Sequence, residues 1–181
     1  MSEFFALPPD DQVIDLSSDD YFMGEALRQA AKAYAGEEVP IGAVMVRGGK
    51  IVARAHNQVE MLKDATAHAE ILAISQTQQV VDDWRLTECT LYVTKEPCPM
   101  CAGAIMLSRI KRVVFGVGDP KAGGAGGALN ILELPGLHHK CSSTGGVREN
   151  ECQMMLKSFF KEQRQRRDNG DESTPPARGL N

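Results

Sequence analysis

Apolar residues recur along the chain at two spacings, one typical of helices and one typical of strands. Ser17 or Ser18 can cap a first helix, and its apolar positions are Phe22, Met23, Ala26, Leu27, Ala30 and Tyr34. Two short apolar runs, I-G-A-V-M-V (41–46) and I-V-A-R-A (51–55), flank R-G-G-K. This pattern predicts a β-hairpin with a glycine turn.

Helix and strand patterns then alternate to the end of the body. The predicted helices are 67–77, 98–108 and about 149–166, and the predicted strands are 90–94 and 112–117. The glycine-rich segment 119–127 predicts a loop. Strands that alternate with helices imply parallel strands joined by helical crossovers, and the opening hairpin adds an antiparallel edge. We therefore expect an α/β fold with a mixed sheet and helices on both faces.

Composition adds the domain boundaries. A chain of 181 residues with 43% hydrophobic content suits one domain with a core. We place that domain at 18–167, after a flexible acidic leader (1–17) and before a polar, proline-containing tail (168–181) that we expect to be disordered.

Charge and cysteine content narrow the function classes. The net charge is −4, but residues 21–167 carry 19 basic and 15 acidic residues, so the body is mildly basic and permits a polyanionic partner. We see no targeting segment and no apolar run near the roughly 20 residues that span a bilayer, so we expect a cytoplasmic protein without a membrane partner. Five cysteines without an export signal argue against a disulfide framework and favour metal binding or catalysis.

The pair in E-P-C-P-M-C is the first candidate for chemistry. Cys98 and Cys101 are three apart, so on a helix both sulfurs face one side and can reach one ion. Pro99 suits a first helical turn, where the helix also favours thiolates. By itself the pair fits catalytic zinc, structural zinc, a redox pair or coincidence. Cys89, Cys141 and Cys152 form no second C-x-x-C.

His68 and Glu70, in T-A-H-A-E, are the second candidate. Each taken alone is a helix-cap residue or a helix-start acid. One histidine and two thiolates make three zinc ligands with a fourth position open, which is typical of catalytic zinc. Residues two apart on a helix point about 200° apart, so His68 and Glu70 suit one ligand and one acid/base rather than two ligands.

H-A-E (68–70) with P-C-P-M-C (97–101) matches the H-x-E…P-C-x-x-C signature of zinc-dependent nucleobase deaminases. The chain over about 20–165 resembles the bacterial tRNA-specific adenosine deaminases of the cytidine/deoxycytidylate deaminase superfamily. The segments that carry the resemblance are 38–44, 56–57, 64–71, 90–105, 108–116 and 119–126.

The resemblance implies a three-layer α/β/α cytidine-deaminase-like fold with a central mixed five-stranded sheet. It also implies a homodimer that converts adenosine to inosine at the wobble position of tRNA, with one Zn²⁺ per subunit. His68, Cys98 and Cys101 would then hold the zinc, and Glu70 would be the proton shuttle. Asn57 would bind the target base, Asp119 and Lys121 the flanking nucleotides, and Phe160 and Arg164 would lie near the anticodon stem-loop.

The RNA-contact residues also have plainer interpretations. Asn57 can be a turn residue after a strand, and the 119–127 loop shows no phosphate-binding fingerprint. The last helix carries five bases and one acid in 157–167, with Phe159 and Phe160 among them. This suits RNA contact, or a solvated basic face with phenylalanines in the core. Ala65, His138 and Gln163 depart from the family's usual residues, and Gln163 stands where the family often has an arginine.

Two rival functions remain at this stage. One is a deaminase of a free base or nucleoside on the same fold, such as guanine or cytosine. The other is a non-catalytic, zinc-stabilised module that holds RNA. Asn57, the 119–126 loop and the basic last helix favour a nucleic-acid substrate, and Glu70 argues against a purely structural metal.

Overall fold

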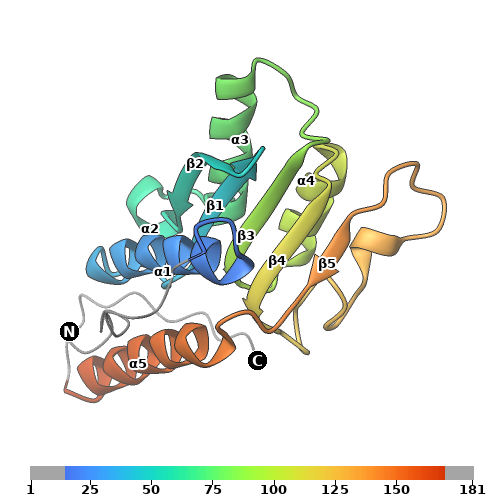
Figure 1. The fold of residues 1–181 in the computed structure, drawn as a ribbon. Coiled ribbons are helices and arrows are strands. Elements are labelled where there is room, and N and C mark those ends of the chain that lie inside the picture. The colour runs from blue at the N-terminus through green and yellow to red at the C-terminus, as the bar shows by residue number, and fades with distance from the viewer. Residues whose placement is uncertain (1–14, 170–181) are drawn as a thin grey trace.

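The computed structural model describes residues 15–169. Its elements, in chain order, are α1 (Asp19–Ala35), β1 (Gly42–Arg47), β2 (Lys50–His56), α2 (Val59–Leu62), α3 (Ala69–Val81), β3 (Cys89–Lys95), α4 (Pro99–Leu107), β4 (Arg112–Val117), a 3-10 turn η2 (Ile131–Glu133), β5 (Ser142–Thr144) and α5 (Glu149–Asp168) (Figure 1). Residues 1–14 of the predicted leader and 170–181 of the predicted tail lie outside the described part, and Asp168 is helical.

The five strands form one mixed sheet in the order β2-β1-β3-β4-β5. β1 pairs antiparallel with both β2 and β3, whereas β3–β4 and β4–β5 are parallel. The mixed sheet, its antiparallel hairpin at one edge and its five strands are therefore confirmed. In the hairpin, Gly48 and Gly49 both have positive φ, 56° and 74°, which a two-residue turn of this hand requires.

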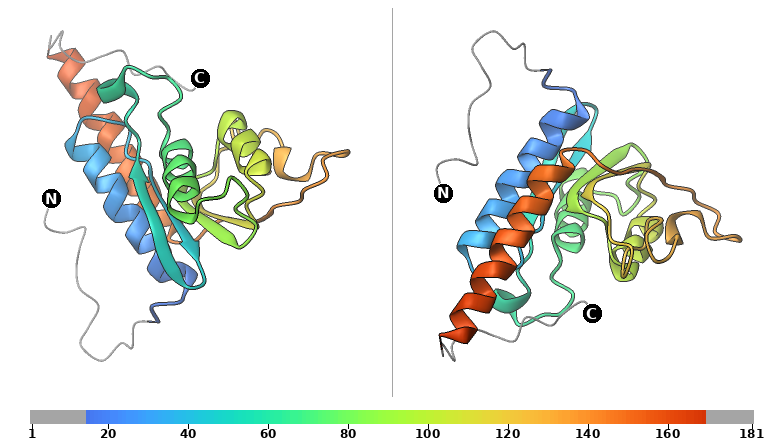
Figure 2. Two further views of the ribbon diagram at one scale, coloured as in Figure 1. Left: turned by 90° about the horizontal axis from the view of Figure 1, so that it is seen from above. Right: turned by 90° about the horizontal axis from the view of Figure 1, so that it is seen from below.

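Helices cover both faces of the sheet, as predicted, and make three layers. α1 and α5 lie side by side on one face, and α3 and α4 cover the other (Figure 2). Alternating strand residues supply the two cores: Met45, Leu91 and Val113 face α3 and α4, and Val44, Tyr92 and Val114 face α1 and α5.

The element boundaries differ from the predictions in a few places. Helix α1 is capped by Ser18, whose hydroxyl accepts a hydrogen bond from Tyr21 N. Helix α3 begins at Ala69, because His68 has extended backbone angles, and continues to Val81. The position of the fifth strand, β5, and the short helix α2 were not predicted from the sequence pattern. β5 contains only Ser and Thr, so no apolar pattern marks it, and its parallel pairing with β4 makes it a strand.

Candidate metal centre and active site

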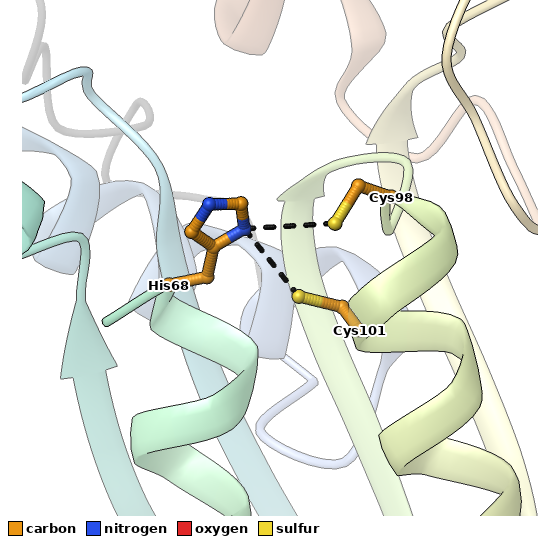
Figure 3. Close-up of side chains that lie close together, drawn as sticks. All are labelled: His68, Cys98 and Cys101. Atoms are coloured by element: carbon orange, nitrogen blue, oxygen red, sulfur yellow. Dashed lines mark hydrogen bonds between the residues drawn. The ribbon is translucent and has the colours of Figure 1, made fainter. Parts of the chain in front are cut away.

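The side chains of His68, Cys98 and Cys101 converge at one point beside the sheet. His68 Nδ1 lies 3.6 Å from Cys98 Sγ and 3.5 Å from Cys101 Sγ (Figure 3). In the described part of the chain, these three form a group whose ligand atoms all lie within 4.8 Å of one another. The fold thus brings together the three residues predicted as metal ligands, from segments 30 and 33 residues apart.

Two helix N-termini hold this cluster. His68 is the N-cap of α3 and Cys98 the N-cap of α4, both with extended backbone angles, and Pro99 occupies the first turn of α4. Cys98 therefore lies just outside the helix rather than on one helical face with Cys101. The positive ends of two helix dipoles meet here, which favours thiolates and the negative charge they bring.

Hydrogen bonding distributes charge unequally between the two thiols. Hydrogen bonds from Cys101 and, to a lesser degree, from His68 together lower the pKa of the Cys98 thiol to about 4. The same hydrogen bond, together with burial, raises the pKa of Cys101. The pair thus presents one ready thiolate, and a coordinating metal would deprotonate the second.

Glu70 lies beside the cluster in the first turn of α3. Its side chain is 3% exposed, and Oε2 has no hydrogen-bond partner in the described structure. Burial raises the pKa of this carboxyl, and the neighbouring His68 and Cys101 only partly oppose that rise. A buried oxygen without a partner is costly unless a further group meets it. One imidazole and two sulfurs fit the donor set of a zinc ion with one open position. The unpartnered Glu70 oxygen fits a hydrogen bond to a ligand in that open position.

Asn57 follows β2 next to this centre and is buried. Its Nδ2 donates to Glu38 Oε2 at 3.1 Å, and Glu38 Oε1 accepts from Met61 N at 2.7 Å. The backbone of the next residue, Gln58, bonds to Ala67 O and so ties this segment to His68. Because a carboxylate only accepts hydrogen bonds, the Asn57 amide must turn its nitrogen, and not its oxygen, toward Glu38. No local sequence pattern predicted this role for Glu38.

Asp119 and Lys121 lie in the predicted loop, close to the metal-ligand segment. Gly124 N donates to Pro97 O at 2.7 Å, next to Cys98. Asp119 is buried; its Oδ1 accepts from Lys121 N and Ala122 N, and its Oδ2 pairs with Lys95. Lys121 itself is exposed.

Phe160 and Arg164 lie on α5, which packs on the sheet face opposite α3 and α4 (Figure 2). Phe159 is buried against Tyr34, with ring centroids 5.5 Å apart, whereas Phe160 is half-buried and Arg164 exposed. A hollow of about 350 Å³ between the end of α5 and α2 is lined by Gln163 and Arg166 on one side and by Met61 and Lys63 on the other. Met61, whose N–H donates to Glu38, is therefore shared between this hollow and the Glu38–Asn57 pair. A larger hollow, at the C-terminal end of α3, contains none of the predicted site residues.

Comparison with known proteins gives consistent results. Residues 17–164 match the model of the MafB19-like deaminase family. A tRNA-specific adenosine deaminase of Bacillus subtilis is 47% identical over 152 residues, which cover 84% of this chain and 94% of that protein. The tRNA-specific adenosine deaminase of Aquifex aeolicus is 46% identical over 145 residues, covering 80% of this chain and 95% of that one.

Solved structures agree with these matches. A structure from work on A-to-I editing by tRNA:A34 deaminases at the wobble position of transfer RNA superposes with a TM-score of 0.73 and 41% identity, over 75% of this chain and 99% of that one. A guanine deaminase of Nitrosomonas europaea superposes with a TM-score of 0.71 over 86% of this chain and 94% of that chain, but with 24% identity. The second likeness extends to the fold alone.

Proposed function

Because the chain belongs to the tRNA-specific adenosine deaminases, within the MafB19-like deaminase family, we propose that it converts adenosine 34 of tRNA to inosine and releases ammonia. It would do so as a zinc-dependent hydrolase. The observation that carries the proposal is the cluster of His68, Cys98 and Cys101 beside the buried, unpartnered carboxyl of Glu70. A tRNA substrate also implies a cytoplasmic location.

His68, Cys98 and Cys101 would hold one zinc ion per subunit, since imidazole and thiolate are the donors that zinc prefers. When bound, the metal lowers the pKa of a water molecule to about 7 and so makes hydroxide available at neutral pH. Forming the bond from oxygen to C6 and breaking the bond from C6 to the amine both require proton transfers, which a carboxyl within hydrogen-bond reach can carry out.

Glu70 would carry those protons. It would take a proton from the attacking water and give it to ring N1 of adenine as C6 is attacked. It would then take the second proton from the new C6 hydroxyl and deliver it to the leaving amine, so that C6 becomes a carbonyl and ammonia departs. Its enclosure in the first turn of α3 supports this role, because its carboxyl is held beside the cluster and away from bulk water.

The substrate contacts are proposed on both family resemblance and position. Asn57 would bind the target base, and Asp119 and Lys121 would contact the flanking nucleotides. The backbone bonds from Gln58 to Ala67 and from Gly124 to Pro97 place both segments next to metal-ligand residues. Phe160 and Arg164 would contact the anticodon stem-loop from the exposed, basic side of α5.

We extend the proposal to a homodimer formed through α4. This helix has no charged residue, and it exposes Met100 (37%) and Leu107 (78%), with open space above Gly103 between them. Leu107→Glu should convert a dimer to a monomer in light scattering, whereas Met154→Glu, on α5 across the sheet, should not. A wild-type protein that scatters as a monomer would contradict the dimer.

Within residues 15–169, none of the helices combines the length and the apolar character that crossing a bilayer requires.

One experiment tests the activity against its rivals. The zinc-loaded protein is incubated separately with an A34 anticodon stem-loop, a G34 stem-loop as matched control, free adenosine, cytidine and guanine. We expect equal amounts of inosine and ammonia from the A34 stem-loop and none from the G34 control. Activity on free guanine alone would overturn the tRNA assignment, and RNA binding without turnover would indicate a binding module.

A further inference from the structure

Glu96 is a buried carboxylate that the proposed chemistry does not use. It is 4% exposed and lies two residues before Cys98. Its Oε2 accepts from Asp119 N at 2.7 Å, and its Oε1 accepts from Ala125 N at 3.0 Å and Gly127 N at 2.8 Å. Hydrogen bonds to an ionised acceptor are the strong kind, and they offset the cost of burying the charge. The 119–127 loop is therefore folded around one carboxylate.

Gly123 and Gly127 allow the loop to close on this carboxylate, and Gly124 allows it to pack on Cys98. A Cβ at Gly123 would lie 2.2 Å from Glu96 Cδ, and one at Gly127 would lie 2.6 Å from Oε2. A Cβ at Gly124 would lie 3.1 Å from Cys98 O. At Gly118, by contrast, the nearest atom would be Glu96 Oε2 at 3.8 Å, an ordinary contact. The glycine-rich run thus serves close packing against the metal-ligand segment.

Three successive residues fasten the loop, and the fourth is a metal ligand. Lys95 pairs with Asp119, Glu96 accepts three loop N–H groups, and Pro97 O accepts from Gly124 N. Cys98 follows directly. A shift of the loop relative to the metal centre therefore requires breaking contacts at all three preceding residues, and Glu96 makes most of them.

We propose that Glu96 is a positioning residue that seats the 119–127 loop beside the metal centre, and that binding of the RNA next to the target adenosine depends on it. Glu96 acts through the loop and touches no reacting atom. The dependence on RNA rests on the proposed function, whereas the seating of the loop rests on the contacts alone.

The first test compares Glu96→Gln with Glu96→Ala. Glutamine keeps the size, but its amide nitrogen must face one of the loop N–H donors, so at least one of the three bonds is lost; alanine loses all three. We expect KM for the A34 stem-loop to rise about tenfold in the glutamine variant and further in the alanine variant, with kcat within about threefold of wild type. Zinc content should stay at the wild-type level in both.

A second test uses two glycines of the same segment. Gly123→Ala pushes a methyl group into the Glu96 carboxylate and should raise KM like Glu96→Gln, whereas Gly118→Ala should leave KM unchanged. Because Gly123→Ala acts through Glu96, it should add little in the Glu96→Ala background. Additive effects in the double variant would overturn the shared mechanism.

Amide hydrogen exchange separates this inference from the proposed function. Exchange of the 119–127 amides should speed up in Glu96→Gln and Gly123→Ala but not in Gly118→Ala, whether or not the protein deaminates RNA. If the wild type is inactive on the stem-loop yet exchange responds as expected, the proposed function fails and the seating of the loop stands. Unchanged amide exchange in Glu96→Gln would show that Glu96 does not hold the loop, and would overturn the proposal. A lowered melting temperature with unchanged KM would show that Glu96 contributes to folding only, and would overturn it as well.

Discussion

At the scale of single residues, the proposed chemistry depends most on Glu70. Glu70→Gln keeps the size of the buried side chain but cannot take up and return a proton. We expect the variant to bind zinc at the wild-type level and to form inosine at least about 10²-fold more slowly. Metal analysis and a single-turnover assay on the stem-loop measure the two effects. Glu88→Gln, at an exposed carboxylate, is the matched control. A zinc-loaded Glu70→Gln variant with normal turnover would remove Glu70 from the mechanism.

A second residue-scale prediction concerns the neighbours Glu37 and Glu38. Glu38 is buried and bonds both Asn57 Nδ2 and Met61 N, so Glu38→Ala leaves two donors unpaired. We expect this variant to lose about 1–3 kcal/mol of unfolding free energy and about tenfold or more in kcat/KM. Glu37 is exposed and pairs with Arg166, so Glu37→Ala should lose at most about 1 kcal/mol. Denaturant unfolding and steady-state kinetics compare the pair. Equal losses in both variants would contradict the assigned role of Glu38.

Which site residues could be found from sequence depends on where their partners lie. His68 with Glu70, and Cys98 with Cys101, sit in two short motifs, so spacing alone raised them as candidates. The hydrogen-bond partners of Glu38 and Glu96 lie 19 to 31 residues away in the sequence. Only the folded chain brings those partners together, so no local pattern marks them.

At the scale of elements, helix α5 explains one departure from the family's usual residues. Gln163 is 8% exposed and faces the protein, whereas Arg164 is exposed. The departure from the family's arginine therefore lies at an inward-facing position of α5. It does not remove a positive charge from the solvent-facing side of the helix. Of the two adjacent phenylalanines, Phe159 is buried in the core, whereas Phe160 is half-buried.

The proposed RNA contact of α5 is testable at Arg164. If this guanidinium meets a phosphate, Arg164→Ala should weaken stem-loop binding to a similar degree for all sequences and reduce the salt-dependence slope by about 1. Gln165→Ala, at the next position, which is also exposed, should change neither the binding nor the slope. Fluorescence anisotropy at several salt concentrations measures both variants. An unchanged slope in Arg164→Ala would place the RNA elsewhere.

The start of α1 is joined to the sheet by a charged contact that predicts a pH effect. Asp19 accepts two hydrogen bonds from Arg112 on β4, at 2.9 and 2.7 Å, and one from the Tyr92 hydroxyl. The Arg112 hydrogen bond lowers the pKa of Asp19 below its usual 3.8. A lowered folded-state pKa adds stability that is present above the unfolded-state value and is lost as pH falls through the folded-state value.

Asp19→Asn should therefore melt below wild type at pH 7, and the difference should shrink as pH falls below about 4. Melting curves by circular dichroism from neutral pH downward measure it. Glu88→Gln, whose exposed side chain pairs with Arg47, serves as the control and should show little difference at any pH. A constant gap between Asp19→Asn and wild type across this range would show that the Arg112 contact does not depend on the charge of Asp19.

At the scale of the whole molecule, the cluster of His68, Cys98 and Cys101 joins the N-termini of the two helices on one sheet face. The pattern of apolar residues was enough to predict a mixed sheet covered on both faces, because strand and helix periods are local. It did not predict β5, whose pairing with β4 is set by the fold, and it did not show that α3 and α4 direct their N-termini at one point. That convergence places two thiols and an imidazole together at a cost that a bound cation would offset.

Metal removal should therefore destabilise the whole domain. Since a ligand that binds only the folded state adds about 2.7 kcal/mol at 100 times its Kd, a chelator should lower the melting temperature by roughly 5–10 °C, and added zinc should restore it. Cys101→Ser should have a lowered melting temperature before any chelator is added, and neither the chelator nor added zinc should change it. Cys152→Ser, at a buried cysteine outside the cluster, should melt lower than wild type but keep the full chelator response. A chelator response that survives in Cys101→Ser would place the stabilising metal somewhere other than this centre.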